Sequence, residues 1–132
     1  MTATSSLTPT GNVYTDGVLS GGKWGVNTLT FSFPTDGSFY GSAYGSGENT
    51  SGFLAFNPIQ QAAVRSILSQ YSSVINFTFT EMTETSTQHA ELRYAQSSQP
   101  STAWAYYPST SAIGGDAWFA DYVGHRILLA KV

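Results

Sequence analysis

Histidine and aspartate are the residue types in this chain that suit metal chemistry. The sequence has two histidines, His89 and His125, and Asp116 and Asp121 lie between them. A catalytic zinc takes three protein ligands and a water, and H-E-x-x-H supplies two of them because positions i and i+4 share a helix face. No His-Glu pair occurs here. A metal site on His89 and His125 is therefore the weaker interpretation, and a solvated His89 at the start of a strand is favoured.

A hard cation is the second chemistry that the sequence offers. Backbone carbonyls around Gly114 and Gly115, together with the Asp116 carboxylate, are the oxygen ligands that calcium prefers. The alternative is a glycine turn in which Asp116 caps backbone amides. Ligand chemistry alone favours the turn, and the calcium interpretation stays open.

Three familiar patterns fail on their context. Residues 17–23 match G-x-x-x-x-G-K, but Trp24 stands where a phosphate-binding loop needs Ser or Thr, and a strand rather than a helix follows. The stretch His89–Glu91 matches the H-x-E of zinc deaminases, whose other ligands are cysteines, and the chain has no cysteine. No serine is centred in G-x-S-x-G, so a nucleophile elbow is absent.

The composition limits the class of protein. A length of 132 residues suits one domain, and 41% hydrophobic residues with 14% aromatics can form a core. Charged residues make up only 10% and the net charge is −3, so nucleic acid and anionic membranes are not expected partners. No apolar run approaches the ~18 residues needed to cross a bilayer. The first dozen residues have neither the basic nor the apolar region of a secretory signal peptide.

The first half of the chain predicts a lead-in, a strand and a long loop. Residues 1–15 are expected to be a flexible lead-in. Residues 26–34 alternate apolar and polar side chains, which predicts a half-buried strand ended by Pro34. One face of this strand carries Leu29, Phe31 and Phe33, and the other carries Thr30 and Ser32. Residues 35–53 form a Gly/Ser-rich connection that is long enough to be mobile or functional.

A helix and four more strands follow. Asn57 is a suitable N-cap and Pro58 a suitable first helical residue, so a helix is predicted to begin there. Its apolar stripe is Val64, Ile67, Leu68 and Tyr71. Residues 74–82 alternate again, and a strand–helix–strand unit predicts that this strand lies parallel to and beside the first. Shorter strands are predicted at 90–95, 101–108 and 114–119.

Six segments occur in an order and spacing that a known family shares. They are DGVLSGGKWG, LTFSFP, FNPIQQAAVRSILSQYSSVINFTFTE, AELRYAQS, STAWAYYP and GGDAWF, and they cover most of residues 16–119. Together they resemble the N-terminal half of a metzincin zinc endopeptidase, closest to the serralysin-like branch. The resemblance implies an α+β fold, a zincin-like N-terminal subdomain with a twisted mixed five-stranded sheet and one main backing helix. Residues 1–132 would then be a single partial metalloprotease-like domain.

The resemblance also implies where a substrate would bind. Residues 102–107 would be the antiparallel edge strand at the upper rim of the active-site cleft, where an extended peptide adds by main-chain hydrogen bonds. The substrate-contacting positions would be Thr102, Ala103, Trp104 and Ala105. The alternative for these residues is a buried or merely solvated strand.

A weaker resemblance links AYYPSTSAIGGDAWF to the calcium and structural-zinc segment of matrix metalloproteases. Histidines of that family stand at the positions of Trp104 and Trp118, and tryptophan cannot ligate zinc. A structural zinc is therefore not expected. The turn Gly114-Gly115-Asp116 keeps the calcium interpretation open.

The chain departs from the family at its end. The zinc helix H-E-x-x-H-x-x-G-x-x-H, with its general-base glutamate, and the Met-turn have no match, and residues 120–132 form a divergent tail. Gly124-His125 matches only the "GH" inside that motif. Zinc polarises the scissile carbonyl and generates the hydroxide nucleophile. A domain without its ligands is expected to bind a peptide and not to cut it.

These observations predict a truncated or degenerate serralysin-like domain that is catalytically inactive alone. No cofactor is expected in the chain as given, although the family uses zinc and calcium. The expected partner is an extended peptide or protein substrate, and an uncovered Phe- and Tyr-rich sheet face predicts self-association. Family resemblance points to an extracellular location. The alternatives are a non-catalytic peptide-binding module that uses the same edge strand, and a metalloenzyme with an unorthodox or intersubunit site.

Overall fold

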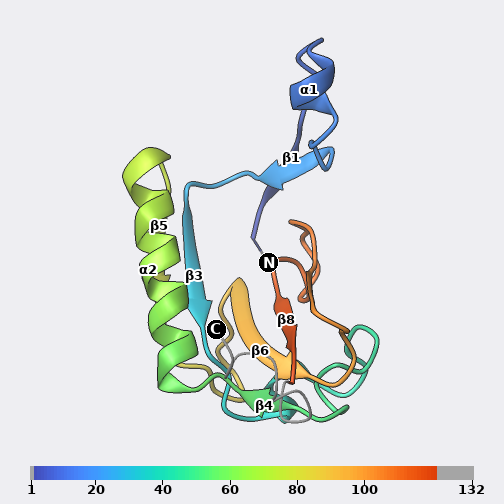
Figure 1. The fold of residues 1–132 in the computed structure, drawn as a ribbon, viewed down its shortest axis with the longest axis vertical. Coiled ribbons are helices and arrows are strands. Elements are labelled where there is room, and N and C mark those ends of the chain that lie inside the picture. The colour runs from blue at the N-terminus through green and yellow to red at the C-terminus, as the bar shows by residue number, and fades with distance from the viewer. Residues whose placement is uncertain (1, 122–132) are drawn as a thin grey trace, which may run out of the picture.

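The main sheet of the protein is mixed, and a single long helix lies along it (Figure 1). A computed structural model describes residues 2–121. The strands follow the order β5-β3-β6-β8-β7 across the sheet. Their bounds are β3 (Thr28–Ser32), β5 (Thr78–Glu81), β6 (Leu92–Ser97), β7 (Ala103–Ala105) and β8 (Ala117–Ala120). All neighbours are parallel except β7, which is antiparallel to β8. The α+β class with a mixed sheet is confirmed.

The helix α2 (Pro58–Val74) begins where the sequence predicts. The Asn57 side chain accepts a hydrogen bond from the Gln60 N–H at 2.9 Å, and the Gln60 side chain accepts one from the Asn57 N–H at 2.8 Å. This capping box satisfies two of the amide groups that a helix start leaves without partners. The predicted β3–α2–β5 unit is also confirmed, because β3 and β5 are parallel neighbours.

The face of the sheet beneath α2 carries the apolar core. Its buried cluster is Leu29, Phe31, Leu68 and Leu92. Of the predicted helix stripe, Leu68 is buried and Val64 packs partly buried against the cluster. The predicted burial of Ile67 and Tyr71 is wrong, since both side chains are about half exposed. The cluster beneath α2 reaches β6 through Leu92, and Ile67 and Tyr71 lie outside it.

The opposite face of the sheet is covered by the connection between β3 and α2. This segment contains the 3-10 helix η1 (Gly37–Tyr40) and the short strand β4 (Leu54–Ala55), which pairs antiparallel with β6. The buried cluster on this face is Tyr40, Tyr44, Ala95 and Trp118. The Gly/Ser-rich connection therefore forms a packed layer of the fold.

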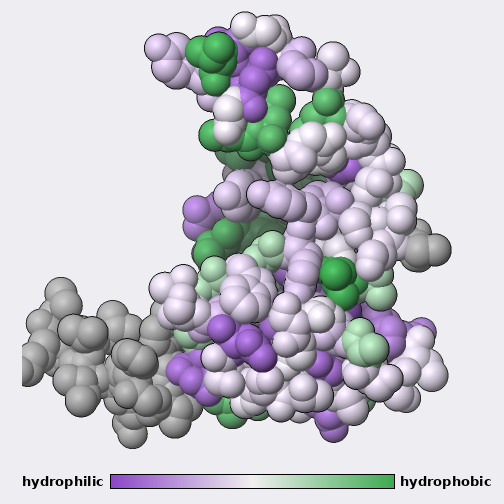
Figure 2. Space-filling view, turned by 90° about the vertical axis from the view of Figure 1, so that its right-hand side faces the viewer, coloured by the Kyte–Doolittle hydropathy of each residue, from purple (hydrophilic) through white to green (hydrophobic). Residues whose placement is uncertain are grey.

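A small N-terminal unit stands away from the main sheet (Figure 1). The strand β1 (Thr4–Ser6) pairs antiparallel with β2 (Gly22–Trp24), and the short helix α1 (Val13–Asp16) lies between them. The expected lead-in therefore contains secondary structure that the sequence did not signal. Figure 2 shows apolar side chains on this unit above a mostly weakly polar body.

Four aromatic side chains form a group on the α2 face near β4. Phe56 lies 6.1 Å from Phe33, 6.4 Å from Tyr94 and 5.3 Å from Phe119 between ring centres. Phe56 is buried and the other three are half-buried. These aromatic side chains therefore pack against one another, and self-association stays a prediction. Within residues 2–121, no helix is long and apolar enough to cross a membrane.

Candidate functional site

The strand β7 forms an exposed edge of the main sheet. Ala103, Trp104 and Ala105 are all exposed, and within residues 2–121 this strand pairs only with β8. The Ala120 N–H donates to the Thr102 carbonyl at 2.7 Å, and the Tyr106 N–H donates to the Asp116 carbonyl at 2.9 Å. Backbone groups alternate in direction along an antiparallel strand. The N–H and C=O groups of Ala103 and Ala105 therefore point away from β8, toward the open edge.

Of the four predicted substrate-contacting residues, two can offer main-chain groups to a peptide. Thr102 and Trp104 direct theirs to β8, at the register positions of Ala120 and Trp118. Ala103 and Ala105 have the outward groups, and their side chains are small enough for another backbone to approach. The structure thus brings all four residues to the edge and divides them into inward and outward pairs.

A buried carboxylate holds this edge in place. Glu48 is fully buried, and it accepts hydrogen bonds from the Trp104 indole N–H at 3.2 Å and from the Tyr106 hydroxyl. Its second oxygen accepts from the Ser46 N–H at 2.8 Å. Burial and the Glu48 carboxylate raise the pKa of Tyr106, so the phenol stays a donor. A buried charge is costly unless donors surround it, so these contacts fasten β7 to the connection that covers the sheet.

Gly45 makes this arrangement sterically allowed. Its φ is +45°, and a Cβ there would meet the Glu48 carboxylate and the Tyr106 hydroxyl at 2.5 Å each. A side chain at this position would push the carboxylate off its donors. The role of Glu48 could not be predicted from nearby residues, because its donors Trp104 and Tyr106 lie more than fifty residues further along the chain.

Asp116, the carboxylate of the candidate calcium turn, is fully buried in an ion pair. Its two oxygens accept from Arg93 Nε at 2.9 Å and Arg93 Nη2 at 2.6 Å, and the Tyr44 hydroxyl adds a third bond at 2.5 Å. Arg93 already neutralises the charge that a calcium ion would need. The calcium interpretation of Gly114, Gly115 and Asp116 thus finds no support in this geometry, and Asp116 is a core ion-pair residue rather than a cap for backbone amides.

The two partners of this ion pair respond differently to burial. Burial raises the pKa of Asp116 to about 6, against the opposing effect of Arg93. Burial acts to lower the pKa of Arg93, but the hydrogen bonds to Asp116 outweigh it and the net direction is upward. Arg93 is therefore the partner that stays charged, and Asp116 is the partner that titrates.

His89 lies in the loop before β6, and a carboxylate fixes its orientation. Its Nδ1 is 2.8 Å from Glu84 Oε2. Glu84 is buried and also accepts from the Ser32 hydroxyl at 2.8 Å and from the Ala90 N–H at 2.6 Å. His89 is partly exposed, as the sequence predicts, but it is held rather than freely solvated.

The described residues do not bring together a set of zinc ligands. Residues 2–121 contain no group of three or more side chains able to hold a metal ion. His89 has Nδ1 occupied by Glu84, and the other candidate ligand, His125, lies outside the described residues along with most of the tail 120–132. A three-ligand set is therefore not assembled around His89 here.

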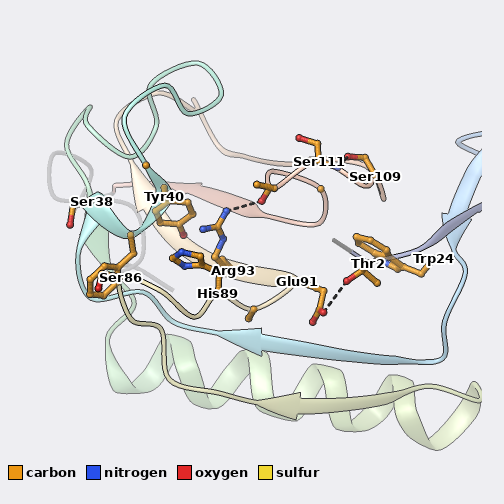
Figure 3. Close-up of a pocket in the computed structure, with 15 residues that line it drawn as sticks. Thr2, Trp24, Ser38, Tyr40, Ser86, His89, Glu91, Arg93, Ser109 and Ser111 are labelled. Atoms are coloured by element: carbon orange, nitrogen blue, oxygen red, sulfur yellow. Dashed lines mark hydrogen bonds between the residues drawn. The ribbon is translucent and has the colours of Figure 1, made fainter.

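A cleft of about 490 Å³ lies on the face of the sheet opposite α2 (Figure 3). Tyr40, His89 and Arg93 line one end, and Trp24 and Glu91 lie toward the other. These residues come from the N-terminal unit, η1 and the start of β6. His89 and Glu91 are the H-x-E pair of the sequence, but their partners in the cleft, Trp24 and Tyr40, come from other segments, so the sequence did not predict the cleft.

No family model matches the chain, and none of the curated proteins compared with it matches. The metzincin resemblance therefore rests on the six sequence segments alone.

Proposed function

We propose that this chain is the sheet-bearing part of a serralysin-like metzincin domain, and that it holds an extended peptide along β7. We further propose that these 132 residues alone do not cleave that peptide. An extracellular location belongs to the same proposal, because it too comes from the resemblance.

The observation that carries the proposal is the outward direction of the Ala103 and Ala105 backbone groups. Strand addition takes its affinity from main-chain hydrogen bonds along an exposed sheet edge. The edge offers two N–H and two C=O groups between side chains too small to block a second strand. Glu48 fixes Trp104 and Tyr106 behind the strand, so little ordering is needed when a peptide binds.

The arrangement of elements supports the metzincin assignment. The resemblance implies a mixed five-stranded sheet, one backing helix and an antiparallel edge strand. The strand path β5-β3-β6-β8-β7 is mixed, with α2 along β3 and β5 and with β7 antiparallel at the edge, and the two-residue β4 adds a sixth strand beside β6. Mixed sheets with a helix on one face are common among α+β proteins, so the arrangement supports the family without identifying it.

The expected absence of cleavage follows from the zinc-binding motif that the sequence lacks. In a zinc peptidase the metal supplies a polarised carbonyl and a hydroxide nucleophile. The H-E-x-x-H motif that would hold the metal, and that includes the general base, does not occur in these 132 residues.

Peptide binding is tested with a fluorescently labelled, unstructured peptide and anisotropy titration. We expect saturable binding that Ala103→Pro and Ala105→Pro each abolish, because proline removes an outward N–H donor and leaves the ladder to β8 intact. Ala103→Ser is the matched control, since it keeps both the N–H and a small side chain. Undiminished binding to both proline variants, with unchanged circular dichroism, would refute binding at this edge.

The lack of cleavage is tested separately. The same peptide is incubated with the chain and zinc, and its mass is followed by mass spectrometry. We expect an intact peptide and no stoichiometric zinc on the dialysed protein. Cleavage that a chelator stops would overturn this part of the proposal and would favour an unorthodox or intersubunit metal site.

A further inference from the structure

The cleft opposite α2 is of the size that small-molecule sites have in proteins. It lies on the loop-covered face and does not include β7. Figure 3 shows Tyr40, His89 and Arg93 beside one another at one end, whereas Thr2, Glu91, Ser109 and Ser111 lie away from them. The chemistry of this end indicates which ligand it would take.

Tyr40 brings an unused hydroxyl to the cleft. The residue is 92% buried, and its Oη is the one buried side-chain polar atom within residues 2–121 that has no hydrogen-bond partner. Buried hydroxyls in folded proteins are almost always satisfied, so one without a partner beside a cleft marks a place for a ligand atom. Burial raises the pKa of Tyr40, so the hydroxyl remains a donor.

Arg93 and His89 place two further nitrogens at the same end. Arg93 uses Nε and Nη2 on Asp116 and on the Ala112 carbonyl, and Nη1 has no hydrogen bond within the described residues. Its guanidinium lies 4.2 Å from the centre of the Tyr40 ring. Glu84 holds the His89 Nδ1, which leaves Nε2 as the free ring nitrogen.

The acidic residues near this end are already occupied. Asp116 is bonded to Arg93 and Tyr44, and Glu84 is bonded to His89, Ser32 and Ala90. At this end of the cleft, the Tyr40 hydroxyl and Arg93 Nη1 therefore remain as donors, and the His89 ring lies beside them. Donors of this kind suit a carboxylate, whose two oxygens can accept from both a hydroxyl and a guanidinium.

The rest of the cleft suits an apolar body. Trp24, Phe39, Ala90 and Ala112 contribute apolar surface to its walls. Glu91 lies near the far end, where it accepts hydrogen bonds from Thr30 and Thr2. Its negative charge would repel an acid group placed there and so fix the orientation of the ligand.

We propose that this cleft binds a small organic acid with an apolar or aromatic body. Its carboxylate accepts hydrogen bonds from the Tyr40 hydroxyl and Arg93 Nη1 and lies beside the His89 ring. The body of the ligand lies against Trp24 and points toward the end that Glu91 occupies. This site is independent of the peptide edge at β7.

The test is isothermal titration of the whole chain with phenylacetate, and with phenylacetamide as a neutral probe of the same shape. We expect phenylacetate to bind about tenfold more tightly, because a charged acceptor strengthens each hydrogen bond. Tyr40→Phe should weaken phenylacetate binding about tenfold, as loss of one hydrogen bond to a charged group does. Tyr107→Phe is the matched control, since Tyr107 is exposed and does not line the cleft.

The variants also separate the proposal from simpler explanations. Tyr40→Phe removes a hydroxyl that has no partner, so it should fold at least as stably as the parent. His89→Gln keeps an amide donor for Glu84 and should leave the preference for phenylacetate over phenylacetamide in place, since the Tyr40 hydroxyl and Arg93 carry that preference. Equal affinities for the two probes, no measurable binding, or phenylacetate binding that Tyr40→Phe does not change would overturn the proposal. Ala103→Pro should leave phenylacetate binding unaltered, so the proposal for the peptide edge and the proposal for the cleft are tested independently.

Discussion

The two faces of the sheet are packed in different ways. Beneath α2 the buried residues are apolar, as Leu29, Leu68 and Leu92 illustrate. On the opposite face, Trp118 packs beside the Arg93–Asp116 ion pair. One layer is formed by a regular helix and the other by an irregular connection. A loop layer brings backbone and polar side chains inward, and these must find partners there.

Where loops cover the sheet, polar contacts as well as buried apolar area hold the loops in position. Glu48, Glu84 and Asp116 each lie buried with three or more hydrogen bonds. Such contacts are directional, so they fix the loops that carry β7 and the cleft. Both candidate sites lie where this polar layer meets the sheet, and neither lies under the helix.

The largest expected difference between the faces concerns Trp118. Trp118→Ala should lower the free energy of unfolding by about 4 kcal/mol, because it empties a fully buried site among Tyr40 and Tyr44. Leu68→Ala on the helix face should cost about 2 kcal/mol, since α2 can shift over a partly open edge. Urea unfolding of both variants measures this. A larger loss for Leu68→Ala would reverse the ranking of the two faces.

The ion pair is expected to have the next largest effect. Arg93→Met should cost about 3 kcal/mol, because it leaves the buried Asp116 carboxylate without its cation. The double variant Arg93→Met/Asp116→Leu should recover most of that loss, since removing both charges also removes the desolvation cost. The same unfolding measurement tests both. A double variant no more stable than the single one would show that the pair contributes directly to stability.

The smallest expected effect is the acid dependence at Glu91. Burial acts to raise the pKa of Glu91, but hydrogen bonds from Thr30 and Thr2 outweigh it, so the pKa lies below its ordinary 4.5. Its contribution to stability is therefore present above about pH 4.5 and is lost as the pH falls through the folded-state pKa.

Glu91→Gln should accordingly flatten the fall in stability between pH 5 and pH 3 by under about 1 kcal/mol, because solvent screens a partly exposed carboxylate. Thermal melts of the two proteins across this range provide the measurement. A variant whose acid dependence equals that of the parent would show that the Thr30 and Thr2 contacts are not formed in solution.

Local signals in the sequence predicted the helix face correctly where the contacts are local. Asn57 and Pro58 mark the start of α2, and the strand–helix–strand order places β3 beside β5. Capping and the parallel crossover depend on neighbouring residues and on chain connectivity, so a sequence shows both. Even on this face the predicted apolar stripe is confirmed only for Val64 and Leu68. Whether Ile67 and Tyr71 are covered depends on what packs against them, and both are exposed.

On the face opposite α2, the alternation of side chains gives a wrong expectation. Because Ser32 alternates with Phe31, the pattern predicts a solvent-facing serine on a half-buried strand. The structure buries it completely, with its hydroxyl donating to Glu84. Period-two alternation reports which face a side chain lies on and does not report what covers that face.

The sequence by itself determined α2 and the five strands of the path β5-β3-β6-β8-β7, the parallel pairing of β3 with β5 and, through the resemblance, the segment that forms the edge strand. Only the tertiary structure decided which backbone groups of Ala103 and Ala105 face outward, that Asp116 pairs with Arg93, and that Tyr40 and His89 meet at a cleft. The physical reason is distance along the chain. Arg93 and Asp116 lie 23 positions apart, and the bond from Tyr106 to Glu48 that holds the edge strand spans 58 positions. Directional hydrogen bonds between such distant residues leave no periodic pattern in the sequence.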